Sequence, residues 1–145
     1  MTHLRICGFH DKYRFLSNFA PSLVELDGET YLTVEHAYVA AKTLNFTARE
    51  EIRLVPSAGQ VKRIGRKLLL REDWEDIKID VMRDLLIQKF ALEPLRSQLL
   101  ETGLAYLEET NTWNDKFWGV CNGQGENHLG LLLMWVREQL TTMPR

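Results

Sequence analysis

The chain has 145 residues, of which 45% are hydrophobic and 26% charged, and its formal net charge is −2. This length and composition predict one soluble globular domain over residues 1–145. The near-neutral charge excludes the chain-wide basic field of many nucleic-acid-binding and membrane-surface proteins, although it leaves room for a local basic groove.

Cysteine usage and apolar runs bear on location. The two cysteines, Cys7 and Cys121, provide no disulfide framework and favour free thiols in a reducing compartment. The N-terminal residues lack the apolar core of a signal peptide. No apolar run approaches the roughly 18 residues that a membrane span needs. We therefore expect a cytoplasmic protein without a membrane partner.

The N-terminal part of the chain predicts a strand, a hairpin and a helix, in that order. Residues 4–9 favour a short strand. Residues 23–32 alternate apolar and polar side chains around Asp27-Gly28, a strong hairpin signal. Thr33 follows directly and is a typical N-cap for the next helix.

Three further helices are predicted in the middle of the chain. The first spans about 46–54 and ends before Pro56, and the second spans about 58–70 after the cap Ser57. Residues 74–91 have the three- and four-residue spacing of an amphipathic helix. The apolar positions that carry this spacing are Ile79, Met82, Leu86 and Phe90.

The C-terminal part predicts a helix from Pro94 to Gly103, a strand over 104–108, and a turn-rich loop over 109–127. A final helix over about 128–140 follows. Its predicted apolar side consists of Leu129, Leu132, Leu133, Val136 and Leu140. Together these elements predict an α+β fold, mainly helical, with a small sheet and hairpin.

The helix after Thr33 places an acid and an amine on one stripe. Glu35 and Lys42 are seven residues apart, which separates them by about 20° around a helix and about 10.5 Å along it. Tyr38 lies between them. One interpretation is a solvated stripe, and the other is a cleft in which a desolvated lysine acts as a nucleophile. The opposite side offers Ala37, Ala40, Ala41 and Leu44 for packing.

Two loops and one basic cluster are also candidates for ligand binding. Ser17 and Asn18 form either a turn or a polar loop that binds a ligand. Trp113 and Trp118 lie in a polar, glycine-rich loop that can stack a flat base, but the glycines do not match a dinucleotide-binding fingerprint. The basic cluster is a solvated face or a patch for a pyrophosphate or nucleic-acid backbone. It consists of Lys62, Arg63, Arg66, Lys67 and Arg71.

Several other chemistries find no support. The four histidines, His3, His10, His36 and His128, show no metal-ligand spacing with one another or with the cysteines. The chain also has no phosphate-loop lysine motif and no G-x-S-x-G elbow. We therefore expect no metal site and no cofactor.

An ordered set of motifs resembles the NADAR family, also called YbiA-like, over nearly the whole chain. The set includes LSNF at 16–19, the Asp-Gly hairpin, TVEHAY with Lys42, LIQKF at 86–90, NDKFWG at 114–119 and GENHLGLLLMWVR at 125–137. The resemblance implies a compact, mainly helical α+β fold, no required metal, and hydrolysis of N-glycosidic bonds in ribose-phosphate compounds.

The resemblance implies two substrate classes. The first is ADP-ribosylated guanine in DNA, with a cognate DNA ADP-ribosyltransferase toxin as functional partner and the chain as its antitoxin. The second is phosphorylated intermediates of riboflavin synthesis. A third reading lies outside enzymes and is a module that binds ADP-ribose or NAD without turnover. The stretch 109–115 is longer than the family's usual path to the NDKFWG motif and carries Trp113, which is either a stacking platform or a core anchor.

The resemblance also implies site residues. Our hypothesis is that Lys42 attacks the anomeric carbon of the ribose and forms a ring-opened Schiff base, while Glu35 or Glu108 moves protons. Asp115 completes the expected catalytic set by orienting a ribose hydroxyl or the water. The expected substrate-binding residues are Ser17, Asn18, Tyr38, Arg66, Trp118, Gly119 and Asn127, with Arg71 as a weaker phosphate candidate that has a structural alternative.

Overall fold

In the computed structural model, which describes residues 4–143, the chain divides into two units with their own internal packing. One unit comprises residues 18–89, and the other combines the described residues on either side of it. The domain over residues 1–145 that the sequence suggests stays a prediction. The fold is α+β and mainly helical, as predicted.

The unit of residues 18–89 begins with the predicted hairpin. Strands β2 (Val24–Leu26) and β3 (Glu29–Tyr31) are antiparallel, with Leu26 opposite Glu29. Asp27 and Gly28 form the two-residue turn with φ of 49° and 86°, the left-handed conformation that such a turn requires. The Asp-Gly signal therefore predicted the hairpin correctly, and the two-residue turn sets the observed register.

Helix α1 (Val34–Ala41) follows the hairpin, and Thr33 caps it as predicted. The Thr33 hydroxyl accepts a hydrogen bond from the His36 backbone N–H at 3.1 Å. The buried His36 ring bridges the Thr33 hydroxyl and the Val55 carbonyl, each at 2.7 Å. Because a carbonyl only accepts, Nε2 of His36 carries the proton. This histidine is part of the helix cap.

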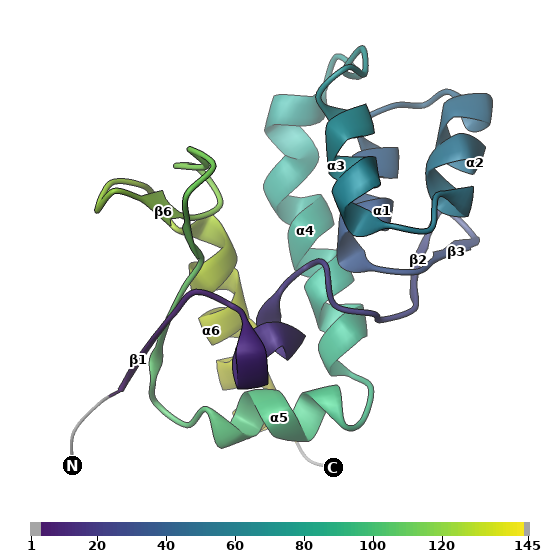
Figure 1. Ribbon diagram of the computed structural model, residues 1–145. Helices are drawn as coiled ribbons and strands as arrows, with labels where there is room; N and C mark the ends of the chain where they lie inside the picture. Colours follow the sequence, from purple (N-terminus) through teal and green to yellow (C-terminus); the bar gives the residue numbers. More distant parts are fainter. Residues whose placement is uncertain (1–3, 144–145) are drawn as a thin grey trace. The chain divides into compact units, whose positions relative to one another are not determined.

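Helices α2 (Phe46–Leu54) and α3 (Ala58–Gly65) pack against α1 (Figure 1). The Ser57 hydroxyl caps α3 as predicted. Helix α3 ends at Gly65 and not near residue 70, so the prediction of its length is wrong. The residues that follow cross back to α1, where the Arg71 backbone N–H donates to the Lys42 carbonyl.

Helix α4 (Trp74–Phe90) matches its predicted range. Met82, Leu86 and Phe90 are buried as predicted, but Ile79 is exposed. The buried positions instead include Leu85, so the apolar stripe of the helix does not extend to Ile79.

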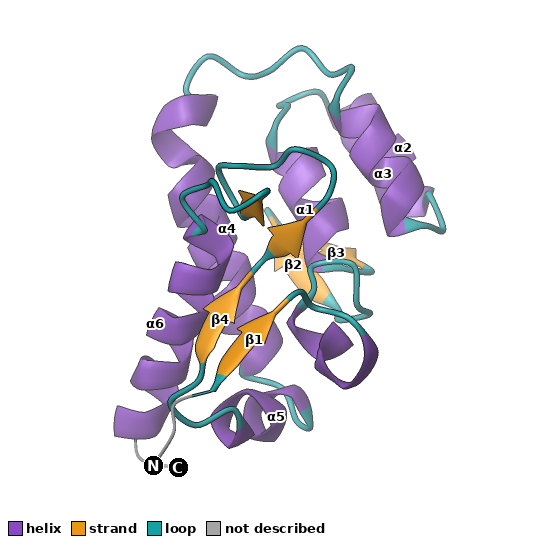
Figure 2. Ribbon diagram, turned by 60° about the vertical axis from the view of Figure 1, so that its left-hand side comes forward, coloured by secondary structure: helices purple, strands orange, loops and turns teal. Residues whose placement is uncertain are grey.

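The second unit contains a parallel strand pair. Strand β1 (Arg5–Cys7) pairs with β4 (Tyr106–Glu108), and Arg5 is opposite Tyr106 (Figure 2). Strands β5 (Thr110–Asn111) and β6 (Val120–Cys121) form another short parallel pair. A 3₁₀ helix, η1 (Asp11–Leu16), was not predicted.

Two helices complete this unit. Helix α5 (Leu95–Glu101) begins after Pro94, and α6 (His128–Thr142) packs against α5 and β4. Most of the predicted apolar side of α6 is buried, whereas Leu132 is only half-buried. Within residues 4–143, none of the helices has both the length and the apolar character needed to span a bilayer.

Candidate active site

The end of helix α1 carries the proposed nucleophile. Lys42 is the first residue after α1 and is half-buried. Its Nζ atom lies 5.4 Å from the centre of the Tyr38 ring, and Tyr38 is only 6% exposed and packs on Trp74. A solvated stripe is therefore disfavoured. The predicted stripe brings Tyr38 and Lys42 together, because they are four residues apart on one helix face.

The prediction that Leu44 packs opposite this stripe is wrong. Leu44 is 69% exposed. Helix α1 ends at Ala41, so the helical spacing no longer determines the direction of the Leu44 side chain. By contrast, Ala37, Ala40 and Ala41 are buried as predicted.

Gly65 brings α3 close to the lysine. A Cβ atom built on Gly65 would lie 3.5 Å from Lys42 Nζ and 3.1 and 3.2 Å from the methyl groups of Val39. Without a side chain at this position, α3 approaches α1 closely and borders the amine. Arg66 comes directly after Gly65 and is exposed. Reasoning from sequence missed this role, although a glycine within a helical pattern is a signal for close packing.

A backbone hydrogen bond links Glu35 and Asn18, which belong to the same unit. The Glu35 N–H donates to the Asn18 carbonyl at 3.2 Å. The Asn18 amide contacts Met82 Sδ at 3.5 Å. Its Oδ1 atom is buried and has no hydrogen-bond partner among the residues that the structure describes. A buried polar atom left unpaired lowers stability, which makes Asn18 a reasonable position for a polar ligand contact.

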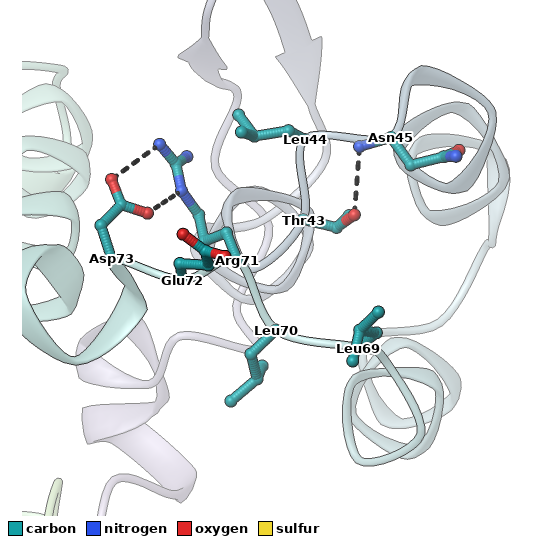
Figure 3. Close-up of a pocket in the computed structure, with 8 residues that line it drawn as sticks. All are labelled: Thr43, Leu44, Asn45, Leu69, Leu70, Arg71, Glu72 and Asp73. Atoms are coloured by element: carbon teal, nitrogen blue, oxygen red, sulfur yellow. Dashed lines mark hydrogen bonds and ion pairs between the residues drawn. The ribbon is translucent and has the colours of Figure 1, made fainter.

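The Arg71 side chain has a structural role, because it contacts Asp73 and the end of α1. Its guanidinium donates to Asp73 at 2.6 and 3.2 Å (Figure 3) and reaches the Ala41 carbonyl at 3.5 Å. The hydrogen bond from Arg71 lowers the pKa of the Asp73 carboxyl. These contacts favour the structural alternative for Arg71 over phosphate binding. An open groove of about 550 Å³ lies here, lined by Thr43, Leu44, Asn45 and residues 69–73.

Glu108 ends strand β4 in the other unit. Its side chain is 15% exposed and accepts from Arg5 at 3.2 Å. The Thr110 hydroxyl donates to its second oxygen at 2.5 Å. Arg5 also lies over the Tyr106 ring at 4.6 Å. The carboxylate is therefore restrained on both oxygens and has a defined orientation.

The predicted catalytic residue Asp115 organises the loop that contains it. Its Oδ1 atom accepts from the backbone N–H groups of Phe117 and Trp118 at 3.2 and 2.9 Å. Asn111 donates to the Asp115 carbonyl at 2.9 Å and accepts from its N–H at 3.0 Å. This pattern is an Asx-type turn, in which the side chain replaces backbone partners.

Asn127 and Gly119 also have structural roles. Asn127 is buried with φ of 55°. Its amide accepts from the Glu109 N–H at 3.0 Å and donates to the Leu107 carbonyl at 2.9 Å. A Cβ on Gly119 would lie 2.1 Å from the Glu109 carbonyl oxygen. Both positions are required by the loop, and their predicted substrate contacts stay predictions.

The two tryptophans of the loop differ in exposure. Trp113 is 48% exposed, which disfavours the interpretation as a core anchor. Trp118 is half-buried and packs edge-on against Phe117 at 4.9 Å. The remaining predicted residue, Ser17, is half-buried at the end of η1.

The predicted site residues thus form two groups, each coherent within its unit. One unit holds Asn18, Glu35, Tyr38, Lys42 and Arg66; the other holds Ser17, Glu108, Asp115, Trp118, Gly119 and Asn127. Within residues 4–143, no three His, Cys, Asp or Glu side chains cluster to hold a metal ion, and His3 lies outside the described residues.

Known proteins resemble the chain over almost its full length. It is 46% identical over 134 residues to "N-glycosidase YbiA" of Shigella boydii, covering 90% of this chain and 83% of that protein. It is 37% identical over 134 residues to "Riboflavin biosynthesis protein VVA0006" of Vibrio vulnificus, covering 90% of this chain and 36% of that longer protein.

A solved structure agrees with these relatives. The NMR structure of the Escherichia coli protein YbiA matches with a TM-score of 0.86 at 42% identity, over 97% of this chain and 87% of that one. The names of the relatives support N-glycosidase function, a class of glycosyl hydrolase. The model of the NADAR domain matches residues 7–141, and the chain therefore belongs to the NADAR domain family.

Proposed function

We propose that the chain is an N-glycosidase that removes ADP-ribose from ADP-ribosylated guanine in DNA through Lys42. The observation that carries the proposal is the position of the Lys42 amine. It lies half-buried over the Tyr38 ring and beside Gly65. An amine partly removed from water loses its proton more readily than an exposed lysine and becomes nucleophilic.

In the proposed reaction, the neutral Lys42 amine forms a bond to the anomeric carbon as the bond to the base nitrogen breaks. The base leaves with that electron pair and takes a proton from an acid, for which Glu35 and Glu108 are the candidates. The lysine nitrogen loses a proton, the ring oxygen leaves the anomeric carbon and is protonated, and a Schiff base forms. One water then adds to this carbon and the amine departs, which releases the sugar.

The surface of α3 supports a DNA substrate. No acidic residue lies between Glu51 and Glu72. Arg63 and Lys67 are exposed and, together with neighbouring residues, line a groove of about 470 Å³. This groove is on the helix whose Gly65 borders Lys42. A DNA backbone in the groove would be recognised through its phosphates.

A second candidate is the hydrolysis of phosphorylated intermediates of riboflavin synthesis. The Vibrio vulnificus relative that favours it is named a riboflavin biosynthesis protein, and the chain spans 36% of its length. The same lysine chemistry would apply to this smaller substrate. The basic groove would then contact at most the phosphate of the substrate itself.

The first test uses an oligonucleotide with one ADP-ribosylated guanine, no added metal, and mass spectrometry of released ADP-ribose. The wild type should release ADP-ribose, and Lys42→Ala should not. Borohydride should trap the wild type as a covalent adduct and leave Lys42→Ala unmodified. Lys78→Ala is the matched control, because Lys78 lies on α4 and pairs with Glu75. An adduct on Lys42→Ala would contradict the mechanism.

The second test separates the substrates. With DNA, Arg63→Gln combined with Lys67→Gln should weaken binding and reduce the salt slope by up to about 2. The control pair, Lys78→Gln with Arg83→Gln, should leave both the binding and the salt slope unchanged. Turnover of riboflavin intermediates but not of the oligonucleotide would favour the second candidate. Binding of ADP-ribose without turnover or adduct would indicate a binding module.

A further inference from the structure

Arg49 on α2 reaches the end of α1. Its side chain is 13% exposed. The Nε–H group donates to the Ala40 carbonyl at 3.1 Å and to the Thr43 carbonyl at 2.8 Å. These two carbonyls belong to residues on either side of Lys42 in the chain. One guanidinium therefore holds the backbone from which the Lys42 side chain starts.

Helix α1 has no basic residue of its own in its last turn. The carbonyl groups at a helix C-terminus carry partial negative charge and lack partners within the helix. Arg49 supplies both a positive charge and a donor to this end from the neighbouring helix. Its contacts are therefore directed at the turn that contains Lys42.

The hairpin orients Arg49 in turn. Its Nη1 atom donates to the Asp27 carboxylate at 2.7 Å, and Asp27 is in the turn between β2 and β3. The Nη2 atom of Arg49 is buried without a hydrogen-bond partner among the described residues. A buried donor left unpaired opposes folding, so this arrangement is not explained by stability alone.

We propose that Arg49 is a positioning residue for Lys42, which holds the carbonyls of Ala40 and Thr43 and thereby keeps the amine over the Tyr38 ring. This inference rests on the proposed role of Lys42 as nucleophile. Neither Arg49 nor Asp27 belongs to the site residues that the sequence predicts. Arg49 acts through the backbone of α1 and not on the substrate.

The test compares Arg49→Gln, Arg49→Lys and Arg53→Gln in the full chain. Arg53 is the matched control, since it lies one turn later on α2 and pairs with Glu50 and Glu29. The measurements are kcat and KM on the ADP-ribosylated oligonucleotide and hydrogen exchange of the Lys42 and Thr43 amides. All are made below the melting temperature of each variant.

We expect Arg49→Gln to lower kcat by about 10- to 100-fold, because small displacements of a reacting group have effects of this size. KM should stay within about twofold, and both amides should exchange at least about tenfold faster, as expected for local opening. Arg49→Lys should recover part of kcat because it keeps the charge and one donor. Arg53→Gln should leave all three quantities near wild type.

Three outcomes would overturn the proposal. Unchanged kcat in folded Arg49→Gln would show that Lys42 does not depend on Arg49. An equal loss in Arg53→Gln would show a general effect of altering α2. If the wild type neither releases ADP-ribose nor forms an adduct, the proposed function fails, and hydrogen exchange then decides alone. Faster exchange confined to the Arg49 variants would support the inference, and unchanged exchange would overturn it.

Discussion

The end of α1 and the loop 109–127 both carry predicted site residues, but they are built in opposite ways. At the end of α1, side chains from outside the helix, Arg49 and Arg71, satisfy the backbone around Lys42. In the loop, the predicted site residues themselves satisfy the backbone. Asp115 accepts two N–H groups, and Asn127 bonds to both Glu109 and Leu107.

This difference shows that residue type alone is a poor guide to function. Asp and Asn are typical of catalytic sites, and they are equally typical of irregular loops because their side chains mimic backbone groups. At the end of α1, by contrast, the Lys42 Nζ atom lies over the Tyr38 ring and beside Gly65. Changes at α1 should therefore affect chemistry, and changes in the loop should affect folding.

The largest expected effect is the loss of turnover when the Lys42 amine is replaced. Lys42→Arg keeps the positive charge but removes the group that forms a Schiff base, so turnover should fall by about 10³-fold or more. Release of ADP-ribose from the oligonucleotide measures this, and thermal unfolding should change little. Retained turnover would show that the charge and not the amine matters at α1.

The largest effect on folding is expected at Gly119. In Gly119→Ala, the new methyl group would lie 2.1 Å from the Glu109 carbonyl oxygen, and backbone atoms cannot move away easily. Overpacking of this kind destabilises by about 3 kcal/mol or more. Urea unfolding measures the change, with Gly123→Ala as a comparison without steric contact, although its φ of 74° makes some strain expected there too.

A smaller effect is expected for Asp115→Asn. The amide oxygen of asparagine can still accept from the Phe117 and Trp118 N–H groups, so the loop should keep its structure. We expect stability to change by about 1 kcal/mol or less and turnover to stay within about threefold if Asp115 only builds the loop. A loss of about 100-fold in kcat with unchanged unfolding would instead assign Asp115 to catalysis and weaken the contrast between the two regions.

The smallest effect is expected on the thermal stability of the protein at acidic pH. The pKa of Asp73 is lowered by its hydrogen bond from Arg71. A carboxyl with a lowered pKa in the folded state stabilises the protein above its unfolded pKa, and this contribution is lost as the pH falls through the folded value. Because Asp73 is exposed, the loss should be modest. When the pH is lowered from neutral to below about 4, the melting temperature should fall less for Asp73→Asn than for the wild type.

Local signals in the sequence determined much of the fold. Thr33 and Ser57 cap their helices, and Asp27-Gly28 closes the hairpin, because each signal acts over a few residues. The resemblance added the family and the catalytic interpretation of Lys42, which the spacing had left open. No comparable local signal predicted the 3₁₀ helix over 11–16 or the end of α3 at Gly65.

Only the tertiary structure determined which polar side chains have hydrogen-bond or ion-pair partners within the protein. The pairing of Arg5 with Tyr106 joins strands that are far apart in the chain, and it places Glu108 beside Arg5. Likewise, nothing near Arg49 in the sequence indicates that it reaches the carbonyls around Lys42. A local pattern reports the conformation of its own few residues, whereas hydrogen-bond partners and burial depend on segments that meet only after folding.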